Sequence, residues 1–385
     1  MNGALPRSLR RPSWPALIWL AVLVLALIGG LVLAADSDVG NTDVSTAAAL
    51  PAVPPTPLAE QVSPLWSSDD GFDDQRTVAS GTVITASDRG VRGLDAQTGE
   101  ERWHYLRSNA TMCDFTVLED VVVAFFRTTG RCNEAVALEA DSGVRRWYRN
   151  VGFSDRLSAL GSGTAALAAT PDGIAVMDAV GNSIRWRYNP PQGCELSSIG
   201  IGSSGVVVLE TCPSGTDWLA EFDLYSGEQQ WRVAPPPGEV SVLGADGVVS
   251  LLVEQQLTVL SARTGQILST LTQDAEPGES AAAASVAEPG GRGVPVVYLS
   301  GRVYAIDPTD GSELWSMAAM GLPATSDAGL VVPEDGAFVT RDLLTGEEIS
   351  RTSLTGGDAP EGLLRVERIG PGLVAVTEDG LTAYG

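Results

Sequence analysis

The chain has 385 residues, of which 44% are hydrophobic, 19% are charged and 43 are glycine, a composition typical of compact globular proteins that excludes disorder for most of its length. It carries 24 basic and 48 acidic residues, and because a formal net charge of −24 repels phosphate backbones, we expect no nucleic-acid partner. Every basic residue is arginine and the single histidine is His104, which excludes lysine chemistry and multi-histidine metal centres.

The first element along the chain is an apolar run from Trp14 to Ala35, long enough as a helix to cross a hydrocarbon core of roughly 30 Å. Arg7, Arg10 and Arg11 precede it, and no acidic residue occurs among the first 35, which favours a cytoplasmic N-terminus. The sequence therefore predicts a single-pass cell-membrane protein, with residues 1–13 in the cytoplasm, 14–35 a transmembrane signal anchor, and the remainder extracytoplasmic. A cleaved signal peptide is the alternative, although the apolar cores of signal peptides are shorter.

Residues 36–64 lose periodicity and are rich in Pro, Ala and Thr, which predicts an extended, partly stiff extracytoplasmic linker. A binding motif for another module at Pro54, Pro55 and Pro57 is the alternative interpretation of this composition.

From residue 65 onward one pattern repeats many times, most clearly in VRGLDAQTGEERW, which ends at Trp103. An apolar strand enters an acidic residue, a glycine follows four positions later, and a tryptophan follows eight positions after the acid. Copies ending at Ser269 and Ser350 keep the turn but lack the tryptophan. The candidate repeat residues are Asp95, Gly99, Trp103, Gly143, Trp147, Asp178, Trp186, Asp223, Gly227, Trp231, Asp307, Gly311, Trp315, Asp342 and Gly346.

The spacing of these motifs, about 41 residues, is the length of a β-propeller blade. The acidic side chain is expected to accept hydrogen bonds from the turn amides, the glycine to supply a positive φ, and the indole to cover the seam with the next blade. Upstream hairpins, whose turns end for example at Gly90 and Gly173, supply further strands; the innermost strand is the hardest to recognise, for instance around residues 72–80 and 364–369. The C-terminal strand at Leu381–Gly385 lacks an outer partner, which PLWSS around Trp66 provides. The prediction is therefore an all-β, eight-bladed propeller with split-blade closure, with seven blades as the alternative.

The repeated D-A-x-T-G-x-x-x-W, seen at Asp95 to Trp103, resembles the tryptophan-docking motif of the pyrroloquinoline-quinone (PQQ)-like β-propeller family. The resemblance covers residues 65–385 and implies a quinoprotein-like fold. That family includes dehydrogenases that hold PQQ and Ca²⁺, as well as non-enzymatic members such as the propeller lipoprotein of the barrel-assembly machinery. This chain has no adjacent cysteine pair and no Glu/Asn/Asp set that matches the family's calcium site. We therefore expect no catalytic, cofactor-binding or metal residues.

The four cysteines occur as two pairs, Cys113 with Cys132 and Cys194 with Cys212, and each pair follows a motif tryptophan and flanks one predicted hairpin. Four cysteines allow three pairings, and the repeated bracketing selects these two as disulfides in an oxidising compartment. Each is expected to join the inner two strands of one blade, and the spacing does not fit a zinc site.

Three other places in the chain hold candidate site residues, and each also has a simpler structural explanation. The acidic residues Asp69, Asp70, Asp73 and Asp74 resemble calcium ligands in type but match no EF-hand spacing, so a surface turn is expected. His104 is expected to lie on an outer strand rather than act as a base. Residues 272–295, rich in Ala, Gly and Pro, are expected to form a long flexible loop, a common place for partner binding.

The anchor, the linker, the repeat array and the lack of a convergent catalytic set lead to one hypothesis. The propeller is expected to act as a non-catalytic interaction or scaffold module for an unknown cell-envelope protein. The alternatives are a PQQ-dependent quinoprotein dehydrogenase and an envelope sensor that binds a small ligand or glycan.

Overall fold

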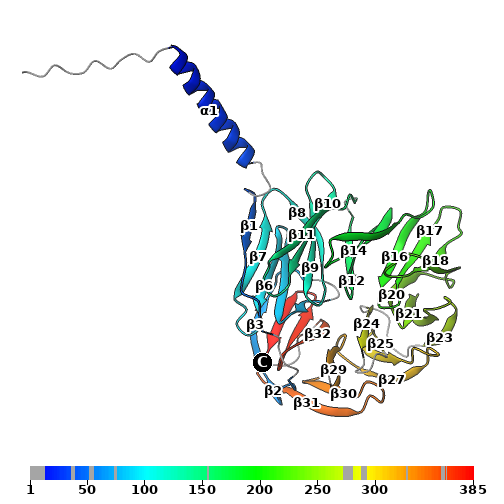
Figure 1. Cartoon of the computed structure of the whole chain (residues 1–385). Coiled ribbons are helices and arrows are strands. Elements are labelled where there is room, and N and C mark those ends of the chain that lie inside the picture. Colours follow the sequence, from blue (N-terminus) through cyan, green and yellow to red (C-terminus); the bar gives the residue numbers. More distant parts are fainter. Residues whose placement is uncertain are drawn as a thin grey trace, which may run out of the picture.

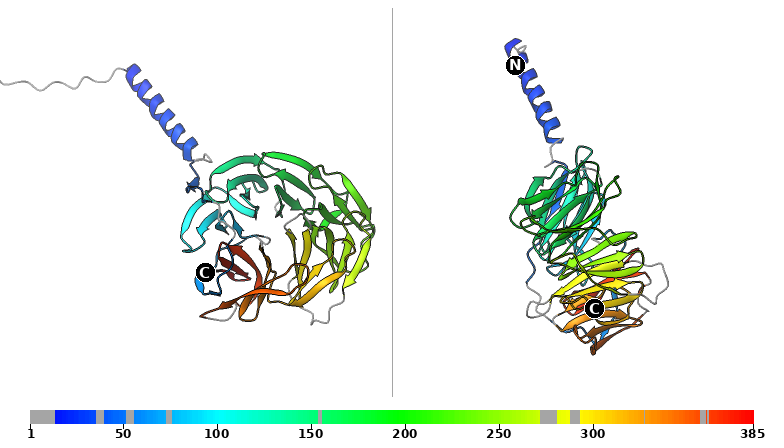
Figure 2. Two further views of the ribbon diagram at one scale, coloured as in Figure 1. Left: turned by 60° about the horizontal axis from the view of Figure 1, so that its bottom comes forward. Right: turned by 90° about the vertical axis from the view of Figure 1, so that its right-hand side faces the viewer.

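The strands form eight sheets arranged in a ring, which the left view of Figure 2 shows face-on. The computed structural model describes residues 14–35, 40–51, 56–72, 76–153, 156–271, 281–287, 293–326, 328–356, 360 and 362–385. The predicted all-β, eight-bladed propeller is confirmed, and the seven-bladed alternative is wrong.

The first seven blades each contain four antiparallel strands that follow chain order from the centre of the ring outward. Blades 1 to 4 are β4 (Val78–Ala79), β5 (Thr82–Ser87), β6 (Gly90–Asp95) and β7 (Glu101–Arg107); β8 (Thr111–Val117), β9 (Val121–Arg127), β10 (Cys132–Glu139) and β11 (Arg145–Asn150); β12 (Ser158–Ser162), β13 (Ala165–Thr170), β14 (Gly173–Asp178) and β15 (Ser183–Tyr188); and β16 (Glu195–Ile201), β17 (Val206–Thr211), β18 (Trp218–Phe222) and β19 (Gln229–Val233). Blades 5 to 7 are β20 (Val240–Asp246), β21 (Val248–Val253), β22 (Gln256–Ser261) and β23 (Ile267–Leu271); β24 (Ala281–Ala287), β25 (Gly293–Leu299), β26 (Arg302–Ile306) and β27 (Glu313–Ala318); and β28 (Ala324–Ser326), β29 (Gly329–Glu334), β30 (Ala337–Arg341) and β31 (Glu348–Leu354).

The core lies between neighbouring sheets, because each blade packs both of its faces against other blades. In β9 the six residues from Val121 to Phe126 are fully buried, and in β13 all six residues are buried. Such strands are apolar without interruption, as strands covered on both faces usually are, rather than alternating between apolar and polar positions.

The eighth blade closes the ring with strands from both ends of the chain. It contains β32 (Leu363–Ile369), β33 (Gly372–Thr377), β34 (Gly380–Tyr384) and the outer strand β3 (Pro64–Ser68), in which Trp66 pairs with Ala383. At the inner side the Thr77 and Val78 amides donate to the Glu367 carboxylate at 2.6 and 2.9 Å. The predicted split-blade closure is confirmed, and it leaves β34 without an open edge.

Two further strands come from the segment predicted as a free linker. β1 (Thr42–Ser45) pairs antiparallel with β7 and adds a fifth strand to blade 1, while β2 (Gln61–Val62) pairs parallel with β31 and does the same for blade 7. The outer strands present unpaired backbone groups that these short pieces satisfy. Residues 40–51 and 56–64 therefore lie against the propeller, in contrast to the expected tether.

The expected long loop at residues 272–295 also contains a strand. β24, with the sequence AAAASVA, pairs with β25 along seven positions and is the innermost strand of blade 6. Alanine has a low β propensity, so the sequence does not signal this strand, which depends on pairing with its neighbour. Residues 272–280 and 288–292 lie outside the described part of the chain.

The one helix in the described residues, α1 (Trp14–Ala35), precedes the propeller and stands apart from it in Figure 1. Over the residues described in full, no helix is both long and apolar enough for a membrane crossing. The transmembrane anchor therefore stays a prediction.

The antiparallel meander gives the propeller two different sides. We call the loop face the side that holds the turns between the second and third strands of each blade, such as residues 128–131, 171–172 and 212–217, together with the connections between blades. We call the turn face the opposite side, which holds the motif turns that follow the acidic residues. The disulfides and the pockets described below all lie at the loop face.

Candidate functional site

Hydrogen bonds from tryptophan side chains join neighbouring blades of the ring. Each motif tryptophan lies on an outer strand and donates its ring N–H to the carbonyl of the residue that follows the acidic position in the next blade. The pairs are Trp66 to Ala96, Trp103 to Ala140, Trp147 to Ala179, Trp186 to Leu224, Trp231 to Ala262 and Trp315 to Leu343, at 2.7 to 3.1 Å. Blades 5 and 7 lack the indole, and in blade 5 the Ser269 hydroxyl donates to the Gly311 carbonyl instead. The tryptophans therefore have a structural role at the blade seams.

The motif glycines are required for two reasons. Gly143 has a φ of +69°, and a Cβ there would lie 2.7 Å from the Trp103 ring of the preceding blade. Gly227 is placed in the same way, at a φ of +71° and 2.5 Å from Trp186. The positive φ can be anticipated from the sequence, whereas the close approach of the indole becomes evident only in the assembled ring.

The acidic residues of the motifs organise the turns. Oδ1 of Asp95, Asp178, Asp223 and Asp342 accepts two backbone N–H bonds from the residues that follow, and that of Asp307 accepts one. Hydrogen bonds from Ser226 hold the pKa of Asp223 below its ordinary value. These carboxylates are occupied within their own turns, which leaves them a local structural role.

A concave feature of the loop face extends across blades 2, 3 and 4. It comprises two pockets of about 340 and 570 Å³ that share Thr170. We call it the blade 2–4 groove and define it by Arg131, Phe153, Arg156, Thr170, Arg187 and Leu196. Its outer part combines arginines with an aromatic ring, and its inner part is lined by leucines and serines from the first strands of blades 3 and 4 together with Arg156.

The groove is lined by three arginines and two acidic residues, Asp114 and Asp172, which gives it a small positive net charge in a protein whose formal net charge is −24. The Arg187 guanidinium lies 5.3 Å from the centroid of the Phe153 ring and donates to the Val151 carbonyl at 2.8 Å. Burial, together with the charge of Arg149, lowers the pKa of Arg187. Two like charges close together favour an anion beside them, so the groove is suited to a carboxylate.

Both predicted disulfides are present and lie at this face. Cys113–Cys132 links β8 to β10, the first and third strands of blade 2, so the expectation that it joins the inner two strands is wrong. Cys194–Cys212 lies at the open end of the β16–β17 hairpin and does join the inner two strands of blade 4. Among the described residues no cysteine is free.

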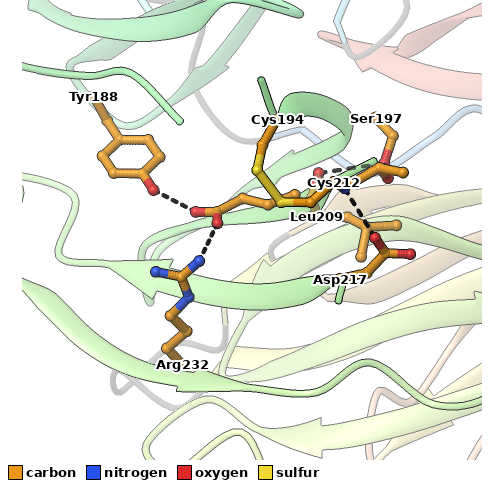
Figure 3. The surroundings of a disulfide bond; sticks show 9 residues. Tyr188, Cys194, Ser197, Leu209, Cys212, Asp217 and Arg232 are labelled. Carbon is orange, nitrogen blue, oxygen red and sulfur yellow. Dashed lines mark hydrogen bonds and ion pairs between the residues drawn. A yellow bond between two sulfur atoms is a disulfide. The ribbon is translucent and has the colours of Figure 1, made fainter. Parts of the chain in front are cut away.

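Beside each disulfide a buried glutamate is held across a blade seam. Figure 3 shows Tyr188, from blade 3, and Arg232, from blade 4, both pointing toward one carboxylate beside Cys194–Cys212. Both donate to the carboxylate of Glu210, which is fully buried. Burial, and then the hydrogen bond and charge of Glu210, raise the pKa of Tyr188. The cluster therefore holds blade 3 against blade 4.

Blade 2 repeats the arrangement with different donors. The Glu134 carboxylate accepts from Arg107 of blade 1 and from the Tyr148 hydroxyl at 2.9 Å. Glu134 follows its disulfide cysteine by two residues and Glu210 precedes its own by two, a signal that sequence reasoning missed. Paired buried charges are costly to disrupt, so these clusters resist separation of blade 1 from blade 2 and of blade 3 from blade 4 at the loop face.

A comparison of the chain with models of known protein families finds one match. The family model described as outer membrane protein assembly factor BamB matches residues 59–171, 132–298 and 173–331, which together span well over half of the chain. The chain belongs to this BamB family. No curated protein sequence matches it.

Solved structures resemble the propeller at low identity. BamB from Moraxella catarrhalis is 18% identical, with 84% of this chain and 99% of that chain covered and a TM-score of 0.49. The computationally designed Ika8 protein is 15% identical, with 85% and 99% covered and a TM-score of 0.57. The C-terminal WD40 domain of Sif2 is 10% identical, with 85% and 99% covered and a TM-score of 0.52. The last two support the propeller fold alone.

Membership of the BamB family does not by itself bring a cofactor site. Within the described ranges, no group of three or more His, Cys, Asp or Glu residues is placed to hold a metal ion. The groove presents Asp172 and Asn189 beside arginines, and its other acid, Asp114, is engaged with the Phe115 and Ala159 amides. This set of side chains does not fit the Ca²⁺ that accompanies PQQ.

The remaining sequence candidates lie away from the groove. His104 is on β7 and forms ion pairs with Asp43 and Glu101; burial lowers its pKa, but the hydrogen bonds and charges of the two acids outweigh this and raise it. Asp70 pairs with Arg92 at 3.4 Å. Asp73 and Asp74 lie outside the described residues.

Proposed function

We propose that this BamB-family propeller is a membrane-anchored, extracytoplasmic interaction module without catalytic activity, and that the blade 2–4 groove is its docking surface. The observation that carries the proposal is the groove itself, a concave surface with arginines on a framework fixed by two disulfides and two buried glutamate clusters. An assembly factor, as the family is described, acts through other proteins, which supports the same interpretation.

The chemistry of the groove defines the kind of partner segment that suits it. Arg131, Arg156 and Arg187 favour carboxylates, while Phe153 and Leu196 favour apolar side chains. An extended acidic segment with apolar residues between its carboxylates satisfies both. The overall charge of −24 repels such a segment elsewhere on the surface, which confines it to the groove.

The test is crosslinking in cells followed by affinity purification and mass spectrometry of the tagged protein. The variant Arg131→Glu with Arg156→Glu reverses two exposed groove charges, and Arg145→Glu with Arg263→Glu makes the same charge change at exposed positions elsewhere. We expect a stoichiometric partner that is lost in the groove variant and retained in the control. A partner retained equally in both variants contradicts the groove assignment, and no partner with the wild type contradicts the function.

A further inference from the structure

His104, the single histidine of the chain, connects the N-terminal segment to blade 1. Its side chain is 16% exposed, and each of its ring nitrogens faces a carboxylate. Nδ1 lies 2.5 Å from Oε1 of Glu101 on the same strand, and Nε2, which is shielded from solvent, lies 3.3 Å from Oδ1 of Asp43 on β1. Ionised carboxylates only accept hydrogen bonds, and an imidazole donates from both nitrogens only when it is doubly protonated. The arrangement therefore fits a positively charged His104.

The other charges around the ring determine which contact depends on this proton. Arg92 on β6 lies opposite His104 in the sheet, and its Nε is 3.3 Å from Oε2 of Glu101. Arg92 also pairs with Asp70 at 3.4 Å. Glu101 therefore keeps a positive partner when His104 is neutral. The described part of the chain offers Asp43 no cation other than His104.

Removing one proton from His104 changes its contact with Asp43 from attraction to repulsion. The shorter contact with Glu101 favours the tautomer that keeps its proton on Nδ1, which turns the lone pair of Nε2 toward the Asp43 carboxylate. Burial lowers the pKa of His104, but the hydrogen bonds and charges of Glu101 and Asp43 outweigh burial and raise it above 6.5. The attraction is thus fully present below about pH 6.5 and is lost as the pH rises through the raised pKa.

β1 has few other contacts that could hold it in place. It is an added edge strand of 4 residues, none of which is buried, and it pairs with β7 alone. Elements with little buried apolar surface open locally at a low cost in free energy. The loss of one ion pair consequently shifts β1 toward a detached state. The next attachment along the chain is Ala47, whose amide donates to the Ser142 carbonyl at 2.9 Å.

Detachment of β1 lengthens the connection between α1 and the propeller. With β1 in place, residues 36–39 alone separate Ala35 from Gly40, and these five Cα steps span at most about 18 Å. With β1 detached, the first attached residue is Ala47, and the twelve Cα steps from Ala35 span at most about 43 Å.

We propose that His104 is a pH-responsive clamp, which holds β1 on blade 1 as an imidazolium, releases it as a neutral imidazole, and so controls how far the propeller reaches from α1. The clamp is a property of the fold alone, whereas its effect on reach rests on the membrane-anchored module proposed above. In that module the clamp regulates the distance from the membrane at which the docking surface can act.

The presence of a single histidine makes its titration directly measurable. Full-length protein labelled with ¹³C-histidine and prepared without a polyhistidine tag has one imidazole signal in nuclear magnetic resonance spectra. We expect a titration midpoint above 6.5, which Asp43→Asn lowers and Glu60→Gln leaves unchanged, since Glu60 is an exposed acid of the same N-terminal segment. A wild-type midpoint at or below 6.5, or one that Asp43→Asn does not lower, overturns the clamp.

Amide hydrogen exchange of the full-length protein measures the release of β1. Protection of Thr42–Ser45, corrected for the intrinsic exchange rate, should fall by at least about threefold between pH 6 and pH 9 relative to β3, another outer strand from the N-terminal segment. His104→Gln should hold β1 equally weakly at both pH values. Protection of wild-type β1 that does not change, or that falls equally in His104→Gln, overturns the clamp.

Energy transfer in vesicles separates this inference from the proposed function. The full-length protein is reconstituted into phosphatidylcholine and phosphatidylglycerol vesicles with rhodamine-labelled headgroups, and a donor is attached through an azide-bearing residue at Gln97, an exposed turn residue of blade 1. Transfer should decrease between pH 6 and pH 9 in the wild type but not in His104→Gln. Constant transfer in the wild type overturns the control of reach. Failure of the protein to float with the vesicles overturns the anchoring in the proposed function and the control of reach with it, while hydrogen exchange decides the clamp by itself.

Discussion

Replacing Glu221 by Gln should change how the stability of the propeller depends on pH. Glu221 lies on β18 with 1% of its surface exposed, and its Oε1 has no hydrogen-bond partner among the described residues. Burial raises the pKa of Glu221 from 4.5 to about 7; the nearby Trp231 indole opposes this and the charge of Asp223 adds to it. The folded state therefore retains a proton at pH values where the unfolded chain has lost it.

The sign and size of the effect follow from linkage between protonation and folding. A raised carboxyl pKa contributes stability that is fully present below about pH 4.5 and is lost as the pH rises through about 7. Between pH 5 and pH 8 the wild type should lose about 2.5 kcal/mol from this group, which Gln cannot lose because it does not titrate. For a propeller of this size the change corresponds to roughly 3 °C in thermal midpoint.

Differential scanning calorimetry of both proteins at pH 5 and pH 8 measures this difference. The midpoint of Glu221→Gln should rise relative to the wild type on going from pH 5 to pH 8. Glu228→Gln, at an exposed position of the same blade, is the matched control and should show no such change. A difference between wild type and Glu221→Gln that is the same at both pH values would refute the argument.

Four further predictions address the ring and its seams. Gly143→Ala should destabilise the fold well beyond the roughly 1 kcal/mol expected from a positive φ, because the added Cβ meets the Trp103 ring. Gly130→Ala is the control, since Gly130 has a φ of +78° with open space around it and should show the backbone cost alone. Equal losses of stability in the two variants, measured by calorimetry, would contradict the packing of the indole against Gly143. Trp103→Phe should cost about 1–3 kcal/mol by leaving the buried Ala140 carbonyl without its donor, and an unchanged midpoint would count against that bond. Deleting residues 381–385 should lower the thermal midpoint by removing most of β34, to which β3 pairs, and an unaltered midpoint would disprove split-blade closure. Replacing Cys194 and Cys212 together by Ser should cost about 2–4 kcal/mol, and non-reducing peptide mapping of the wild type should recover the two local pairs.

Much of the architecture is predictable because the repeat acts over short distances. Asp95, Gly99 and Trp103 lie within nine residues, and each copy forms the same turn and outer strand wherever it stands in the ring. Counting the copies, together with the incomplete strands at the two ends, yields eight blades. The two disulfide pairs are equally local, since the cysteines of each pair are separated by 18 or 19 positions.

The features that sequence reasoning missed depend on contacts between distant segments. β24 is an alanine-rich strand that exists because β25 pairs with it, and β1 and β2 are short pieces whose sequences show no alternation. Glu210 accepts from Tyr188 in another blade; its spacing of two residues from Cys212 is a signal in the sequence, but that spacing does not identify the partner.

The amino-acid sequence by itself determined the class of fold, the number of blades and the two disulfides, because these follow from residue spacing within one repeat. Only the tertiary structure shows that most of the predicted linker is part of the propeller and that arginines gather in a groove at the loop face. Only the tertiary structure shows that the indole of the preceding blade packs directly against a motif glycine. The physical reason is that edge pairing, pocket lining and seam packing join residues from different blades or from opposite ends of the chain, whose proximity arises only when the ring closes.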